Sequence, residues 1–249
     1  MIIRQDLCVG CGRCHPFCPT DAILWAGLKS TVDQVKCLEC GSCLRVEICP
    51  VNAIEEHPEV YEYPRAIRKF FSDPASTHKA TGIQGRGTEE SKTNDVTGRV
   101  GPDKVGIAIE VGRPTVGMTL VDVQKITRAL ARNGITEIEE CNPIHSMYED
   151  SKTGDLREDL LDERVLSAII EIVVPHDKAR LVLRTAKEVA KEVESVFVLD
   201  IFSTLQPGLT IQPQILKMLE EEGLPWRPNA KINMGLGRVT DREQPRELP

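Results

Sequence analysis

Cysteine spacing is the feature of this 249-residue chain that most clearly indicates chemistry. Eight of the nine cysteines form two runs, in each of which three cysteines are spaced two residues apart and a fourth precedes a proline. Three thiolates on such a tight loop bind three irons of one cubane, and the fourth cysteine ligates the other cluster. The spacing therefore predicts two [4Fe–4S] clusters with crosswise ligands. The first set is Cys8, Cys11, Cys14 and Cys49, and the second set is Cys37, Cys40, Cys43 and Cys18.

Other uses of cysteine agree less well with this pattern. Disulfides require an oxidising compartment, whereas no apolar signal segment precedes the first run, which follows directly on Met-Ile-Ile-Arg-Gln-Asp. Structural zinc prefers isolated Cys-x2-Cys pairs to two complete runs that each end in Cys-Pro. The ninth cysteine, Cys141, stands apart, and we expect it to be a buried or loop thiol.

The two runs resemble those of the bacterial-type two-cluster ferredoxins. The likeness extends past the ligands, because Cys18-Pro-Thr-Asp-Ala-Ile is echoed by Cys49-Pro-Val-Asn-Ala-Ile as an internal repeat. It covers roughly the first 60 residues and implies two halves related by a pseudo-two-fold axis, each with a short helix after the Cys-Pro and then a strand. One departure is that five residues separate Cys43 from Cys49, where the family pattern has three. We expect a bulge beside Cys49 that changes solvent exposure or hydrogen bonds to sulfur.

Composition narrows the function classes. The chain is acidic, with a net charge of −7, which argues against general nucleic-acid binding. No run approaches the roughly 18 apolar residues that a membrane helix requires. We therefore expect a cytoplasmic protein without a membrane span. The oxygen sensitivity of clusters in the resembling family implies an anaerobic setting.

The chain is too long for a two-cluster ferredoxin alone, so we expect a second domain. The expected organisation is a ferredoxin domain over 1–60, an extended linker or docking arm over 61–103, an α/β domain over 104–222 and an extended tail over 223–249. Within the linker, a short helix over 64–71 has Ile67, Phe70 and Phe71 on its apolar face.

Apolar periodicity predicts the elements of the second domain. We expect strands over 105–111, 135–144, 165–174 and 196–202, helices over 119–132 and 177–193, and a short helix over 210–222. The order βαββαβ is that of a split βαβ fold, a four-stranded antiparallel sheet with two helices on one face. The strands 105–111 and 165–174 are the most apolar and are expected at the centre. The fold class is thus α+β, and the second domain resembles the ferredoxin-like sandwich that includes ACT-type sensors.

The ferredoxin resemblance implies an electron-transfer protein, which we expect to be the redox subunit of a multi-subunit oxidoreductase. No catalytic constellation is predicted, so a catalytic partner would carry the substrate chemistry, and the α/β domain offers a surface for an oligomer. In an alternative from another class, the ACT-like domain binds a small molecule and gates electron delivery. The least favoured alternative places catalysis between the domains, at Cys141 or His145. His15, inside the first cysteine loop, is placed to bias the potential of that cluster.

The ligand assignment predicts the iron content. The chain should hold close to eight irons and eight acid-labile sulfides, because two cubanes each need about four of both. Cys14→Ala should remove or convert one cluster, whereas the matched control Cys141→Ala should leave the content unchanged. Iron and sulfide analysis of protein purified without oxygen measures both. Loss of a cluster from Cys141→Ala would show that the ligand assignment is wrong.

Overall fold

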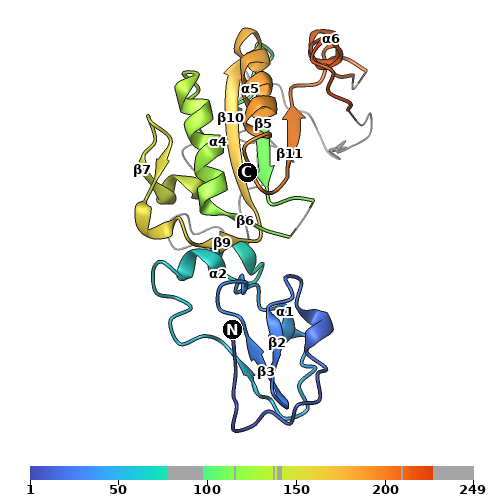
Figure 1. Cartoon of the computed structure of the whole chain (residues 1–249). Coiled ribbons are helices and arrows are strands. Elements are labelled where there is room, and N and C mark those ends of the chain that lie inside the picture. Colours follow the sequence, from blue (N-terminus) through green and yellow to red (C-terminus); the bar gives the residue numbers. More distant parts are fainter. Residues whose placement is uncertain (78–97, 115, 137, 139–141, 209, 227–249) are drawn as a thin grey trace, which may run out of the picture.

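The computed structural model describes residues 1–77, 98–114, 116–136, 138, 142–208 and 210–226. Two packed units follow one another along the chain (Figure 1). The smaller unit holds strands β1 to β4, and the larger unit holds helix α2 and the elements from β5 to α6. Residues 78–97 of the expected docking arm, nearly all of the expected tail and Cys141 lie outside the described residues.

The smaller unit is closed by its first and last strands. β1 (Ile2–Ile3) pairs antiparallel with β4 (Ile54–Glu55), and β2 (Ile23–Ala26) forms a hairpin with β3 (Lys29–Val32). Because β2 and β4 follow the two Cys-Pro pairs, the sequence repeat is also a repeat of structure. The buried residues between these strands form a small core: Met1, Ile3, Ala22, Ile23, Val32, Cys37, Cys43, Ala53 and Ile54.

The helical turns of the smaller unit lie elsewhere than the ferredoxin resemblance implied. η1 (His15–Phe17) and α1 (Ser42–Arg45) come before the fourth cysteine of each run, not after the Cys-Pro. The reason is that Asp21 and Asn52, at equivalent places in the repeat, both have φ of 50° and turn the chain directly into the next strand. The additional residues of the second run are accommodated by α1 and by Glu47, whose φ is 49°.

A three-stranded antiparallel sheet is the centre of the larger unit. β5 (Lys104–Val111) lies between β10 (Ala168–Pro175) and β11 (Phe197–Phe202). Ile107 is opposite both Ile172 and Ile201 in the register, and seven of the eight residues of β5 are buried. The burial of β5 along nearly its whole length is therefore explained by its central place.

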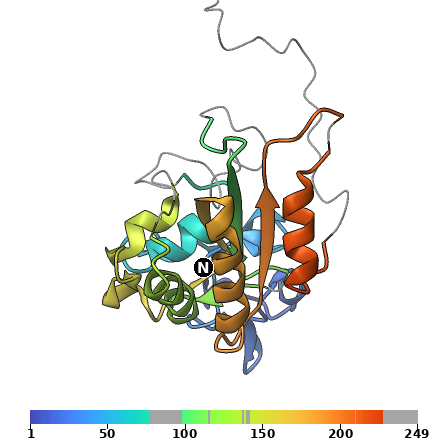
Figure 2. The ribbon, with the colours of Figure 1, turned by 90° about the horizontal axis from the view of Figure 1, so that it is seen from above.

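Two helices pack together along one face of this sheet (Figures 1 and 2). α4 (Leu120–Arg132) begins at the N-cap Thr119, whose hydroxyl accepts a hydrogen bond of 3.4 Å from the Asp122 amide, which confirms the predicted start. α5 (His176–Val189) ends four residues earlier than predicted. Both helices bury most of the apolar positions that the 3.6-residue period placed on one face, but Ala190 lies beyond the end of α5 and is exposed.

The expected strand over 135–144 differs in the structure. Among the described residues, the segment pairs with the sheet only through an isolated bridge between Ile138 and Ile172. Pro143 then starts the 3-10 helix η2 (Pro143–Met147), because proline cannot donate to a strand ladder. The chain is therefore a mixed α/β protein with small sheets, and the four-stranded sandwich stays a prediction.

The remaining elements are short. The expected strand over 165–174 is divided into β9 (Arg164–Val165), which pairs with β6 (Met118–Thr119), and β10. Between η2 and β9 lie the hairpin of β7 (Tyr148–Asp150) and β8 (Asp155–Leu156) and the turn η3 (Glu158–Leu160). α6 (Pro213–Glu221) is the last described helix. No helix among the described residues is both long and apolar enough to cross a membrane.

Part of the expected linker belongs to the larger unit. The helix expected over 64–71 forms as α2 (Ala66–Ser72), and every one of its residues is buried. Ile67, Phe70 and Phe71, together with Ala66, pack in the same core as the central sheet and α4. α2 lies between the two units in Figure 1, so it occupies the junction.

Truncation of an α2 side chain tests this packing. Phe70→Ala should lower the free energy of unfolding by about 3–5 kcal/mol, because it removes a ring that is 2% exposed from a closed core. Leu181→Ala, at a half-exposed position of α5, is the control and should cost less than about 1 kcal/mol. Urea denaturation followed by circular dichroism under anaerobic conditions measures both. Equal, small costs would place α2 outside the core.

Candidate iron–sulfur sites

Four cysteines from both halves of the repeat line one cavity of the smaller unit. They are Cys8, Cys11, Cys14 and Cys49, here called the first site. Its other walls include the apolar side chains of Ile3, Val9 and Ile54. A set of four thiols in an apolar wall fits the ligands and the surroundings of a cubane.

The other four run cysteines, Cys37, Cys40, Cys43 and Cys18, are here called the second site. Burial is the main cause that raises the pKa of the Cys43 thiol to about 12, and the charges of Cys40, Cys37 and Cys18 contribute to that rise. These four sulfurs are therefore close enough to interact electrostatically across the repeat. Among the described residues, no three His, Cys, Asp or Glu side chains are arranged as a site for a single metal ion.

Protons must leave both sites when metal binds. Burial is the main cause that raises the pKa of Cys14 in the first site and of Cys37 in the second. Buried thiols are neutral near pH 7, whereas the ligand of iron is the thiolate. Binding of a cluster at either site would thus release protons from these residues.

Left-handed backbone shapes both cysteine loops at equivalent positions. Gly10 and Gly12 have φ of 67° and 68° in the first loop, and Glu39 and Gly41 have 56° and 69° in the second. A Cβ on Gly10 would lie 1.9 Å from the carbonyl oxygen of Leu28, so no larger residue fits there. The tight curve that lets three thiols face one point depends on these positions.

Glu39 adopts this conformation without being a glycine, and its side chain is completely buried. The Arg65 guanidinium donates to Glu39 Oε1 at 2.8 Å, and the amino group of Met1 binds the other carboxyl oxygen. Burial would raise the pKa of the Glu39 carboxyl, but these two cationic groups lower that pKa below its usual value. The ion pairs offset the strain and the desolvation of this residue.

Backbone amides donate to the sulfur of each fourth cysteine. The Ala22 amide lies 3.1 Å from Cys18 Sγ, and the Ala53 amide lies 3.2 Å from Cys49 Sγ. Ala22 and Ala53 are equivalent in the repeat, since each follows its cysteine by four residues. Hydrogen bonds to ligand sulfur stabilise negative charge on a cluster and so tune its potential.

His15 lies beside the first site, as its position in the loop predicted. Its Nε2 is 2.9 Å from the hydroxyl of Ser30, and its ring lies 4.6 Å from the ring of Trp25. The Ser30 hydroxyl also hydrogen bonds the Cys14 thiol, which lowers the pKa of that thiol against the larger effect of burial. Sequence reasoning missed Ser30, because nothing in the strand Lys29–Val32 indicates a residue that links a histidine to a ligand.

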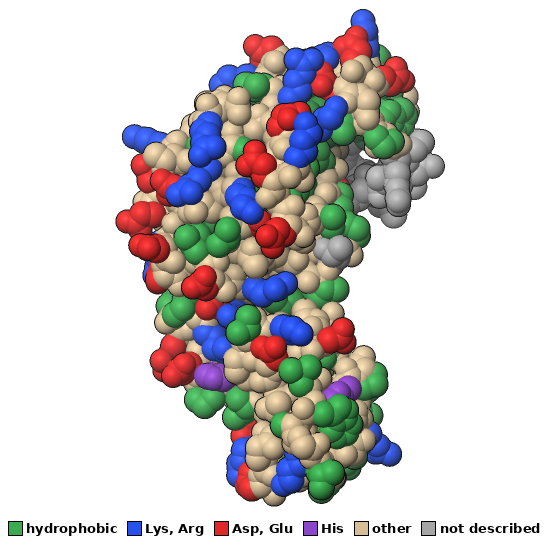
Figure 3. Space-filling model, in the orientation of Figure 1, with side chains coloured by type: hydrophobic (Ala, Val, Ile, Leu, Met, Phe, Trp, Pro, Cys, Tyr) green, Lys and Arg blue, Asp and Glu red, His purple; other side chains and the backbone are tan. Residues whose placement is uncertain are grey.

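The two sites differ in exposure. Cys11 of the first site is exposed, whereas Cys37 and Cys43 of the second site are buried. Large apolar side chains surround the first site at the surface, and Leu28 among them is 91% exposed. Hydrophobic side chains gather at this end of the smaller unit, at the bottom of Figure 3.

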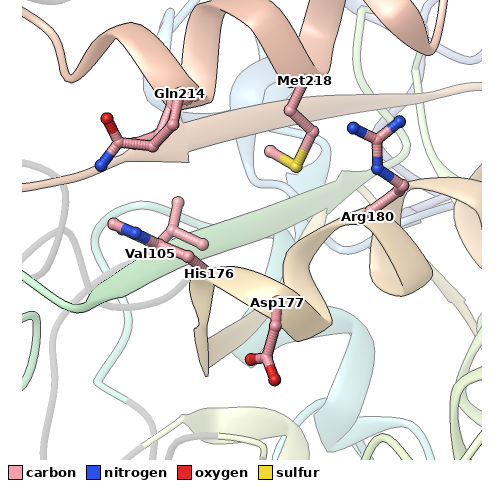
Figure 4. A pocket seen from close by; sticks show the side chains of 7 residues that line it. Val105, His176, Asp177, Arg180, Gln214 and Met218 are labelled. Carbon is pink, nitrogen blue, oxygen red and sulfur yellow. The ribbon is translucent and has the colours of Figure 1, made fainter.

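A second cavity, of about 330 Å³, lies in the larger unit between α5, α6 and β5 (Figure 4). Its lining combines the apolar side chains of Ile215 and Met218 with charged and polar ones, which include Asp177 and Arg180. Arg180 is already paired with Glu221 and Glu222, at 2.5 and 2.7 Å. These ion pairs satisfy the charge of Arg180. His145 lies elsewhere, 3.2 Å from the carbonyl oxygen of Ile138, and Cys141 is outside the described residues.

Comparison with known proteins gives the family. Residues 1–24 match the 4Fe-4S binding domain family. A subunit of an ion-translocating oxidoreductase complex from Methanosarcina acetivorans is 46% identical over 48 residues, 19% of this chain and 17% of that protein. A ferredoxin of Pyrobaculum islandicum is 35% identical over 72 residues, which are 28% of this chain and 65% of that ferredoxin. The chain therefore spans less than two thirds of either relative.

An uncharacterized ferredoxin of Methanocaldococcus jannaschii is matched over more of its length. It is 34% identical over 58 residues, which are 22% of this chain and 73% of that ferredoxin. Together, these similarities support an iron–sulfur electron-transfer role for the N-terminal region. By its N-terminal 4Fe-4S domain, the chain belongs to the ferredoxins.

Proposed function

We propose that this chain carries electrons through two [4Fe–4S] clusters, one held by the first site and one by the second. The observation that carries this proposal is the cavity lined by Cys8, Cys11, Cys14 and Cys49, which combines three cysteines of one run with the fourth of the other. The electrostatic contact of Cys18 with Cys43 supports the complementary set. Bound cubanes supply the chemistry, since each takes up and releases one electron.

The residues around the sites control how easily an electron is accepted. The amides of Ala22 and Ala53 point their positive ends at ligand sulfurs and so favour the additional negative charge of the reduced state. Ile3 and Ile54 limit the access of water to the first site. The exposed loop around Cys11 gives a redox partner its closest approach.

We further propose that the chain is a subunit of a larger oxidoreductase. The similarity to a protein named as part of an ion-translocating oxidoreductase complex supports this proposal. The larger unit then provides surface for assembly, and the bridge from Ile138 to β10 supports a ferredoxin-like sandwich for its fold. The expected anaerobic and cytoplasmic setting is part of this proposal.

Glycine substitutions test the two-cluster assignment. Gly10→Ala should disable the first site only, because the added Cβ would meet a backbone carbonyl at φ of 67°. Gly27→Ala is the matched control, since it has φ of 63° but no atom within 4 Å of the added Cβ. Anaerobic titration with dithionite, followed by EPR, should count about two electrons per chain for wild type and Gly27→Ala, and about one for Gly10→Ala. One electron in the wild type, or two in Gly10→Ala, would contradict the assignment.

Isolation from the native cells tests the subunit proposal. A tagged chain purified without oxygen should elute in a complex that contains a catalytic subunit, and that complex should reduce or oxidise a substrate at the expense of the clusters. The purified chain alone should show no turnover, because no catalytic constellation is predicted in its sequence. A chain that elutes alone at every step, or that converts a substrate with dithionite and no partner, would contradict this proposal.

A further inference from the structure

Helix α2 presents two chemically different sides to its surroundings. Ala66, Ile67, Phe70 and Phe71 pack in the core of the larger unit. Arg68, on the same helix, is only 6% exposed, although arginine is almost never buried unless it is paired. The buried positive charge of Arg68 therefore requires hydrogen-bond or ion-pair partners.

The Arg68 guanidinium joins the loop of the second site to the larger unit. Its Nη1 donates to the carbonyl oxygens of Cys37 at 2.9 Å, Gln34 at 2.6 Å and Val35 at 3.3 Å. Its Nε donates to the carboxylate of Glu163, which lies just before β9. Both side chains of this ion pair are about nine-tenths buried. The Arg68 guanidinium thus contacts both the backbone of the ligand cysteine Cys37 in the smaller unit and the buried carboxylate of Glu163 in the larger unit.

Further contacts fix the same loop. Arg45 donates to the Cys40 carbonyl oxygen at 2.7 Å and to Asp73, just after α2, at 2.5 Å. Leu38, between two ligand cysteines, is 2% exposed and lies beside Gly117 of the larger unit. The loop of the first site packs instead against its own hairpin, where Gly10 lies close to Leu28. The second site alone, of the two, is therefore built against the larger unit.

Charge near a cluster determines how readily it accepts an electron. A cation stabilises the reduced, more negative cluster, and an anion destabilises it. Both effects are strong where the charges are buried, because neither water nor salt screens them. Arg68 and Glu163 are such charges, and Arg68 is the nearer to the second site through its contact with the Cys37 carbonyl.

We propose that Arg68 and Glu163 are opposed positioning residues that set the reduction potential of the cluster at the second site, Arg68 raising it and Glu163 lowering it. This inference rests on the proposed function, because it requires a cluster held by Cys37, Cys40, Cys43 and Cys18. Because Glu163 belongs to the larger unit, the potential of the cluster at the second site then depends on how the larger unit packs against the loop of that site.

Substitutions of opposite charge provide the test. Arg68→Gln should lower the midpoint potential of the second site and Glu163→Gln should raise it, each by about a tenfold change in the reduction equilibrium, or about 59 mV for one electron. Arg68→Lys keeps the positive charge, so its midpoint potential should stay near that of the wild type. The double variant Arg68→Gln with Glu163→Gln removes both charges, and its midpoint potential should also stay near wild type. The control is Arg128→Gln on α4, which removes an exposed cation paired with Asp155. EPR-monitored redox titration of the holoprotein measures each potential, and a Cys14→Ala background isolates the second site.

The opposite shifts expected for the two glutamine variants distinguish an electrostatic effect on the potential from a simple loss of structure. Both glutamine variants break the same ion pair, so a purely structural role would shift the potential the same way in both, and that result would overturn the inference. If Arg68→Gln fails to retain its cluster, Glu163→Gln decides: a raised potential supports the inference, and a wild-type potential overturns it. A wild-type chain without a cluster at the second site refutes the proposed function itself, whereas intact clusters with unchanged potentials refute only this inference.

Discussion

The burial of Arg68 and Glu163 is the constraint on which the junction of the two units depends. Breaking a buried pair of this kind by removing one partner typically costs about 3–5 kcal/mol, because the other charge is left without compensation. Arg68 comes from α2 of the larger unit, its carbonyl partners come from the smaller unit, and Glu163 comes from the segment of the larger unit just before β9. All three parts have to assemble together for either charge to be satisfied. The cysteine loop that contains Cys37 is therefore positioned by tertiary contacts as well as by its own turns.

The two halves of the repeat are alike in backbone and unlike in surroundings. Equivalent residues supply the amide-to-sulfur hydrogen bonds and the left-handed turns in both halves. The first site, however, lies at an apolar end and includes the exposed Cys11, whereas the second site includes the buried Cys37 and Cys43 and lies beside the larger unit. A nearly symmetric ligand set thus comes to occupy two different electrostatic environments. Two environments are what an electron carrier needs if its clusters are to differ in potential.

Local patterns predicted the elements whose stability is local. The N-cap at Thr119, the apolar face of α4 and the buried run of β5 all appear as expected. The prediction was wrong where a pattern competed with tertiary geometry: β10 is separated from β9, and the segment ending at Pro143 enters a 3-10 helix. Apolar residues alone do not specify whether a segment pairs along its length, because pairing depends on a neighbour distant in sequence.

The sequence by itself determined that the N-terminal region has 4Fe–4S chemistry and predicted the ligands, since eight cysteines in two Cys-Pro runs admit few other uses. It also identified the repeat and the apolar helix that became α2. Only the tertiary structure decided what surrounds the sulfurs: the Arg68 contacts with the Cys37 loop, Ser30 between His15 and Cys14, and the burial of Glu39. The physical reason is that ligands are arranged by short-range spacing along a loop, whereas buried charges find their partners across the fold. Arg68 and Glu163 are 95 residues apart in the chain, and no local pattern relates them.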